Sequence, residues 1–162
     1  MIKISNASVD ETSEIKRLLN YVWVDTYKEF FSQETIKYIT EESQTIDKLK
    51  LEIENKNLLF LVAKDSSDNI VGLATAEEKE NKIFLKRLYV HSNCQRKGIG
   101  VKLLLSVLKD FKNKQAIYLE AEKDNIKGIN FYKKNGFKII EDKEYKLKDD
   151  KFSTVVMERT SR

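Results

Sequence analysis

The chain has few of the residues that cross-link a protein or anchor it in a membrane. Cys94 is its only cysteine, so no internal disulfide bond can form, and a lone thiol fits a reducing compartment. One histidine and one cysteine are too few for a structural zinc site, so no metal is expected. No apolar run approaches the roughly 20 residues of a membrane-spanning helix, and Met1–Ser5 lacks the apolar core of a signal peptide. These absences predict a cytoplasmic protein without a membrane partner.

An excess of one charge is also missing. The formal net charge is +4, from 30 Lys and Arg against 26 Asp and Glu, and the two signs alternate through most of the chain. A nucleic-acid-binding protein usually gathers its basic residues on one face, so no nucleic-acid partner is expected. The length suits one domain with a hydrophobic core and is too short for two ordinary ones. Residues 1–162 are therefore expected to form one domain, as a monomer or a homodimer.

The apolar spacing predicts an α+β order of elements. Met1–Ser5 is expected to form a strand, and a helix capped by Asp10 follows it. Trp23–Ser32 is aromatic and irregular, and a second helix capped by Ser32 runs with interruptions to about Asn55. The order β-α-α-β-β-β-α-β-α-β-β describes a mixed sheet covered by helices. Further strands are expected at residues 58–64, 70–76, 82–90, 116–121, 138–141 and 153–158, and further helices at residues 99–111 and 126–135.

The strand at residues 82–90 has an irregular pattern. Ile83 and Leu85 share one parity, whereas Leu88 and Val90 share the other. A change of phase by one residue within a strand is what a β-bulge produces. A strand buried on both faces gives the same pattern, so both interpretations are open.

The segment Gln95-Arg96-Lys97-Gly98-Ile99-Gly100 lies between this strand and an amphipathic helix, and it holds two of the five glycines. Glycine lets the backbone turn tightly and leaves its N–H groups open to a ligand. A helix start adds unpaired N–H groups and the positive end of the helix dipole, and Arg96 and Lys97 add positive charge. The segment predicts either a phosphate-binding turn or an ordinary strand–helix turn that uses glycine.

Two common phosphate-binding motifs are absent. The pattern G-x-x-x-x-G-K-[ST] does not occur, and G-x-G-x-x-G is incomplete because residue 103 is leucine. The pattern Q-x-x-G-x-G after a strand and before an amphipathic helix instead resembles the GNAT acetyltransferase family. Asn125, Phe131-Tyr132 and Gly136-Phe137 resemble that family's Asn … Tyr … Gly-Phe signature, and the predicted order of elements resembles its fold.

The resemblance implies acetyl-CoA as cofactor and a GNAT fold. That fold has a mixed, mostly antiparallel sheet of about seven strands, helices on both faces and a central strand pair that splays apart. It also implies that the glycine-containing loop binds the pyrophosphate, that the bulged strand contacts the pantetheine arm, and that Asn125 and Lys134 reach the cofactor by their side chains. The residues implied in cofactor binding are Leu88, Tyr89, Val90, Gln95, Arg96, Lys97, Gly98, Ile99, Gly100, Val101, Asn125, Tyr132 and Lys134.

By the same resemblance Tyr132 is the general acid. An amine attacks the thioester, and a phenol near the sulfur can protonate the departing thiolate. The alternative is a core role for this ring, for which Phe131 is the better candidate. A base must also take a proton from the amine. Glu78, near the turn before the bulged strand, and Glu120, on the following strand, are expected in that role ahead of His91.

The acceptor is expected near the first two helices, which form the variable part of this family. Trp23 and Tyr27 offer aromatic faces, while Asp25 and Glu29 offer carboxylates, and together they suit a cationic amine. The run Trp23–Tyr27, followed by Ser32-Gln33-Glu34, resembles the PaiA-type branch, which implies spermidine or spermine as acceptor. Three alternatives stay open: aromatic rings that only pack the first helix on the sheet, a protein N-terminus as acceptor, and an acyl-CoA-binding protein without turnover.

Overall fold

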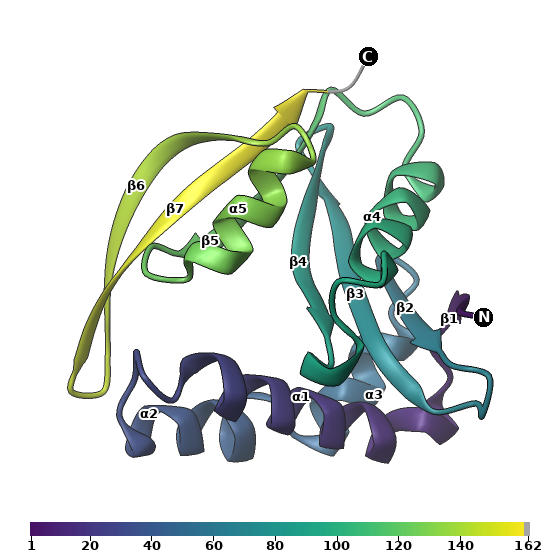
Figure 1. Cartoon of the computed structure of the whole chain (residues 1–162), viewed down its shortest axis with the longest axis horizontal. Helices are drawn as coiled ribbons and strands as arrows, with labels where there is room; N and C mark the ends of the chain where they lie inside the picture. Colours follow the sequence, from purple (N-terminus) through teal and green to yellow (C-terminus); the bar gives the residue numbers. More distant parts are fainter. Residues whose placement is uncertain (161–162) are drawn as a thin grey trace.

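The computed structural model describes residues 1–160 and contains a seven-stranded sheet in the order β1-β2-β3-β4-β5-β7-β6 (Figure 1). Neighbouring strands are antiparallel except β4 and β5, which are parallel. The predicted element order and the mixed sheet are confirmed. The strands are β1 (Lys3–Asn6), β2 (Leu58–Lys64), β3 (Ile70–Lys79), β4 (Lys82–Val90), β5 (Ala116–Glu122), β6 (Lys138–Leu147) and β7 (Asp150–Thr160). The helices are α1 (Thr12–Tyr27), α2 (Gln33–Tyr38), α3 (Ile46–Glu54), α4 (Ile99–Asp110) and α5 (Ile126–Lys134), with short turns η1 (Val9–Glu11), η2 (Ile39–Ser43) and η3 (Ser92–Cys94).

Helices cover both faces of the sheet because successive side chains of the central strands point to opposite sides. In β2, Leu61 joins the core beneath α4 and α5, whereas Val62 joins the core beneath α1 and α3. Leu103 from α4 fills the first core and Leu19 from α1 fills the second, and both are fully buried. The two cores hold the sheet between two layers of helices, as the family resemblance implied.

The phase change in β4 is a β-bulge. Thr75 of β3 pairs with Arg87, but the next residue, Ala76, pairs with Leu85, so Lys86 is the extra residue. Beyond the bulge β4 stays paired with β3 as far as Val90. On its other edge β4 pairs with β5 only at Ile83–Ile117 and Phe84–Tyr118. Residues 85–90 of β4 and 119–122 of β5 therefore lie apart; we call this divergence the splay (Figure 1).

The bulge also decides where Arg87 points. Opposite Thr75, its side chain lies on the face of α3, where the guanidinium donates two hydrogen bonds to the Glu52 carboxylate, at 2.6 and 3.0 Å. Without the extra residue, Arg87 would share the face of Leu85 and enter the core beneath α4. Burial opposes ionisation of Glu52, but hydrogen bonds and charge from Arg87 outweigh it and leave the pKa of Glu52 lowered.

Two expectations about α1 were wrong. Ser8 precedes the first helical turn in place of Asp10, and its backbone N–H donates to Glu11 Oε2 at 2.9 Å. This capping box starts η1, and α1 follows without a break. The helix also continues to Tyr27, so Trp23 and Tyr27 are helical rather than irregular. Its buried face, which includes Val22, keeps the α1 periodicity through the aromatic segment.

Other boundaries differ for local reasons. The segment after Ser32 consists of α2, η2 and α3 as separate pieces, because Thr45 caps a new helix by accepting a hydrogen bond from the Lys48 N–H. Strands β6 and β7 extend beyond residues 138–141 and 153–158, since backbone pairing continues where the side chains are exposed and carry no alternating apolar signal. Among residues 1–160, none of the helices is both long and apolar enough to cross a membrane.

The tip of the β6–β7 hairpin is attached to the start of α2. The Ser32 N–H and hydroxyl both donate to Asp150 Oδ2, at 2.9 and 2.8 Å, and hydrogen bonds from this helix start lower the pKa of Asp150. Lys148 lies 4.7 Å above the Tyr38 ring. The hairpin thus reaches from the far edge of the sheet across to α2 (Figure 1).

Glu52→Gln should destabilise the protein by about 3 kcal/mol, because it leaves Arg87 buried without its counter-ion. The pKa of Glu52 is lowered in the folded state, so its contribution is present above the unfolded value of about 4.3 and is lost as the pH falls through the folded value. Urea unfolding at pH 7 and pH 3 measures both effects. An equal difference between variant and parent at the two pH values would contradict this assignment.

Candidate active site

The loop between β4 and α4 has a backbone geometry that suits an anion. Arg96 and Gly98 have positive φ values of 61° and 80°, and Gly98 occupies the N-cap of α4 in the left-handed conformation. The first N–H groups of α4 have no acceptor within the helix. A Cβ placed on Gly98 would meet no atom within 4 Å, so this side of the loop is open. Gln95 holds the loop to the end of β4 through a 3.1 Å hydrogen bond from Nε2 to the Val90 carbonyl.

Helix α5 lies against this loop. A Cβ on Gly100 would come within 3.2 Å of the Phe131 ring, so the first turn of α4 packs directly on α5. Lys134 follows Phe131 by three residues and is exposed, which places it on a neighbouring part of the same helix surface. The loop residues and Lys134, expected in cofactor binding, therefore come from two elements that touch.

Residues Leu88, Tyr89 and Val90 form one wall of the splay. Leu88 and Val90 pack on the core beneath α4, whereas Tyr89 packs on the core beneath α1. Their backbone is paired with β3 on one edge only, since β5 has already diverged from the other. The free edge offers N–H and C=O groups to an extended polar chain.

Asn125 and Tyr132 stand on the α5 side of the splay. Asn125 caps α5 by accepting a 3.2 Å hydrogen bond from the Gly128 N–H. A Cβ on Gly128 would lie 2.7 Å from Asn125 Nδ2, so the glycine makes room for this side chain; sequence reasoning missed that requirement. The ring of Tyr132 is half-buried between Phe131 and Phe137, with edge-on contacts at 5.3 and 5.4 Å.

Three tyrosines and one glutamate gather at the splay. Burial, followed by the neighbouring Tyr89, raises the pKa of Tyr132 well above the ordinary tyrosine value. The pKa of Tyr27 is also raised, first by burial and then by Tyr89, Tyr132 and Glu122. These phenols are therefore protonated at neutral pH, and Tyr132 has a proton to donate.

Glu122, which the sequence analysis did not single out, ends β5 with a side chain turned inward. The residue is 7% exposed, and among residues 1–160 its buried Oε2 has no hydrogen-bond partner. Burial raises the pKa of Glu122. The signal was weak because the residue lies in a polar stretch, although it alternates with Glu120 on one face of the strand.

The expected bases occupy different surroundings. Glu120 accepts hydrogen bonds from the Tyr145 hydroxyl at 2.9 Å and from Lys143 and Thr154 at 3.3 Å. The His91 ring is stacked on Tyr21 with centroids 4.1 Å apart, and its Nδ1 accepts a hydrogen bond from the Asn93 N–H.

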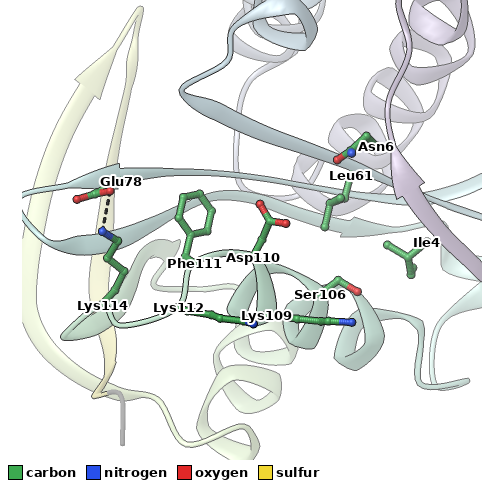
Figure 2. Close-up of a pocket in the computed structure, with 10 residues that line it drawn as sticks. All are labelled: Ile4, Asn6, Leu61, Glu78, Ser106, Lys109, Asp110, Phe111, Lys112 and Lys114. Atoms are coloured by element: carbon green, nitrogen blue, oxygen red, sulfur yellow. Dashed lines mark ion pairs between the residues drawn. The ribbon is translucent and has the colours of Figure 1, made fainter.

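Glu78 is not brought to the splay. In the β3–β4 register it lies opposite Ile83, at the end of β4 that is still paired with β5. Figure 2 shows its carboxylate paired with Lys114 Nζ, at 2.8 Å, at one end of a surface hollow of about 680 Å³ beside the end of α4. Glu120 lies on β5 beyond the last residue paired with β4, whereas Glu78 lies at the paired end. A base at the splay is therefore expected nearer to Glu120 than to Glu78.

A row of aromatic rings runs from α1 to the β6–β7 hairpin. Trp23 and Tyr27, both expected in acceptor binding, begin this row on one face of α1, whereas Asp25 and Glu29 are exposed. We call the rings of Trp23, Tyr27, Phe31, Phe152 and Tyr145, in this order, the aromatic row. The distances between successive ring centroids are 4.3, 5.5, 5.0 and 5.5 Å. Tyr145 at its far end is the residue that bonds Glu120.

The model of the Acetyltransferase (GNAT) family matches residues 19–137. The chain belongs to the GNAT family. The spermidine N(1)-acetyltransferase of Thermoplasma acidophilum is 32% identical over an alignment of 144 residues, and the match covers 85% of this chain and 89% of that protein. The structure of the PaiA N-acetyltransferase of T. acidophilum in complex with coenzyme A superimposes with a TM-score of 0.87 at 28% identity, covering 99% of both chains. These similarities support the PaiA-type branch.

The ribosomal-protein-S18-alanine N-acetyltransferase of Escherichia coli shares the GNAT fold with a TM-score of 0.75. It is 15% identical, and the match covers 99% of this chain and 94% of that one. From its family and its similarity to PaiA-type enzymes, this chain is an N-acetyltransferase that uses acetyl-CoA. The open loop at Gly98 and the one-sided pairing of residues 85–90 fit a cofactor with a pyrophosphate and an extended amide-containing arm.

Gly98→Ala in this GNAT protein should weaken coenzyme A binding about tenfold, because alanine disfavours the left-handed conformation that aims the loop N–H groups. Isothermal titration calorimetry measures the dissociation constant. Gly136→Ala is the matched control, because Gly136 also has a positive φ, 88°, but follows α5, where the nearest atoms to an added Cβ belong to Arg159; a loss of stability without loss of affinity is expected. Unchanged affinity in Gly98→Ala would remove the loop from the cofactor site.

Proposed function

We propose that this acetyltransferase transfers an acetyl group from acetyl-CoA to a primary amine of a polyamine such as spermidine or spermine. The observation that carries the proposal is the aromatic row, which ends at Tyr145 and Glu120 and passes Glu122 at Tyr27. Ammonium groups bind aromatic faces by cation–π attraction and carboxylates by charge pairing. The 32% identity with a spermidine acetyltransferase supports the same acceptor class.

The shape of the row favours a linear cation over a compact one. Its rings come from α1, from the turn that follows α1, and from both strands of the hairpin, so they form a continuous line rather than a cage. A chain with several ammonium groups can contact successive rings and still place one terminal amine at the splay. A protein N-terminus, the alternative acceptor, offers one ammonium group followed by peptide groups and would leave most of the row unused.

On the donor side, the loop from Gln95 to Val101 would hold the pyrophosphate by backbone N–H groups, with Lys134 alongside. The free edge of Leu88–Val90 would hold the pantetheine arm, and Asn125 would contact it from α5. When bound, acetyl-CoA supplies a thioester whose sulfur is the leaving group. Tyr132, protonated because its pKa is raised, donates its phenolic proton to that sulfur.

Tyr132→Phe should lower kcat by about 10²–10³-fold, since general acid catalysis contributes on that scale. Coenzyme A affinity should change less than about twofold, because the ring that packs between Phe131 and Phe137 is retained. Release of free thiol with spermidine as acceptor gives the rate. Tyr118→Phe is the matched control, because that tyrosine stacks on Phe84 where β4 and β5 are still paired.

The pH profile of the parent enzyme tests the same residue. With the pKa of Tyr132 raised, any fall in kcat from loss of this proton should lie above pH 10, the ordinary tyrosine value. A decline centred at or below pH 10 that disappears in Tyr132→Phe would contradict a raised pKa for this phenol.

An amine panel tests the acceptor. Spermidine and spermine should support acetyl-CoA-dependent thiol release, and an alanyl peptide should not. Trp23→Ala should raise KM for spermidine by about tenfold, the loss expected for one partly desolvated cation–π contact, and leave KM for acetyl-CoA unchanged. Tight coenzyme A binding without thiol release across the panel would instead identify an acyl-CoA-binding protein without turnover.

A further inference from the structure

Glu122 is a buried glutamate at the end of β5, and its Oε2 has no hydrogen-bond partner among residues 1–160. Its side chain lies close enough to Tyr27 of α1 to raise the pKa of that tyrosine. We propose that the Glu122 carboxylate is the base that takes a proton from the attacking ammonium group. The inference rests on the proposed function and adds the residue that makes the amine nucleophilic.

The other candidates are engaged elsewhere. Glu120 is bound by Lys143, Tyr145 and Thr154, so its charge is neutralised and its oxygens are occupied. Glu78 is ion-paired with Lys114 and lies opposite Ile83, at the end of β4 that is still paired with β5. His91 is stacked on Tyr21 and uses Nδ1 within its own turn.

Glu122 also has the right neighbours. Glu122, Tyr89 and Tyr132 are all close enough to Tyr27 to raise the pKa of that tyrosine. Burial raises the pKa of Glu122 itself, hydrogen bonds from the backbone of Asp124 and Lys123 lower it, and the charge of Asp124 raises it, while Thr154 of β7 pairs with Glu122 in the sheet. The carboxylate thus belongs to one cluster with Tyr27 of the aromatic row and the proposed acid, where we expect the acceptor amine to bind.

The energetics favour proton transfer in this place. Burial destabilises the Glu122 carboxylate more than the backbone N–H groups of Asp124 and Lys123 stabilise it, so the pKa of Glu122 is raised. An arriving ammonium group relieves that penalty, first as a counter-ion and then by giving up a proton. The local environment therefore promotes both binding and deprotonation of the acceptor through Glu122. It also raises the pKa of Glu122, which increases the proton affinity of the base.

The proton balance is complete without a further reactant. The ammonium gives one proton to Glu122, and the resulting amine forms a C–N bond to the thioester carbon as the C–S bond breaks. The sulfur receives the Tyr132 proton, and the second proton of the attacking nitrogen returns to the Tyr132 oxygen. Glu122 then releases its proton to solvent. The net products are the N-acetylated amine, the free thiol of coenzyme A and one proton.

Glu122→Gln should lower kcat/KM for spermidine by about 10²-fold or more and remove the ascending acidic limb of the pH profile. Glu120→Gln should raise KM but keep that limb. Glu144→Gln is the control. Glu144 is exposed on β6, so this variant should retain the kinetics of the parent enzyme. A Glu122→Gln variant with the parent rate and the parent pH limb would overturn the proposal.

Two readouts separate catalysis from folding. In a ¹³C titration of the glutamate carboxyl groups, one resonance should titrate above the ordinary value of about 4.3 and be missing in Glu122→Gln. The variant should also unfold at an equal or higher temperature, because it removes a buried charge whose Oε2 has no hydrogen-bond partner among residues 1–160. A lower melting temperature, or the absence of a resonance with a raised pKa, would show that Glu122 has a structural role.

A weakly basic amine that is unprotonated at the assay pH needs no base. Its rate should fall far less in Glu122→Gln than the spermidine rate does, and an equal fall for both acceptors would overturn the assignment. Failure of the proposed function has a different signature: the parent enzyme itself would show no spermidine-dependent thiol release.

Discussion

The separation of β4 from β5 is the feature on which the rest of the site depends. A parallel pair that stayed in register would satisfy the backbone of residues 85–90 and close the sheet. Pairing ends at Phe84 and Tyr118, and the extra residue, Lys86, lies two positions further along β4. The strand keeps its bonds to β3, so an unpaired edge can exist beside a rigid partner. That edge leads straight into the loop at the start of α4.

The bulge is held by an ion pair on the opposite face of the sheet from the α4 core. Reversing the parity of β4 after Leu85 turns Arg87 towards α3, where Glu52 receives it with two hydrogen bonds. A slip of the strand by one residue would carry this guanidinium into the apolar core beneath α4, at a cost of several kcal/mol for an unpaired buried charge. The register that opens the splay is therefore enforced by a side chain that takes no part in the chemistry.

The proposed donor side consists mainly of backbone groups, whereas the proposed acceptor side consists of side chains from distant segments. For this reason the two sides could not be predicted equally well from the sequence. The requirements of the donor side for glycine, a phase change and a helix start are local patterns in the sequence. Gln95–Gly100 and the bulge could be located for that reason. The proposed acceptor side depends on side chains from α1 and from a hairpin more than 100 residues later, such as Tyr27 and Phe152. No local pattern predicts that these meet, and the exposed, charged β6 gave no hint of its length.

Glu122 shows the limit of local reasoning most clearly, because its significance lies in what surrounds it. In sequence it is one of many glutamates, but in the fold it is buried beside Tyr27, within the group of tyrosines that includes Tyr132. Burial raises the pKa of both Glu122 and Tyr132. For the phenol this secures the protonated state that an acid needs, and for the carboxylate it increases proton affinity, which a base needs. One desolvated environment thus suits both the proposed acid and the proposed base, and the aromatic residues proposed to bind the acceptor belong to the same environment.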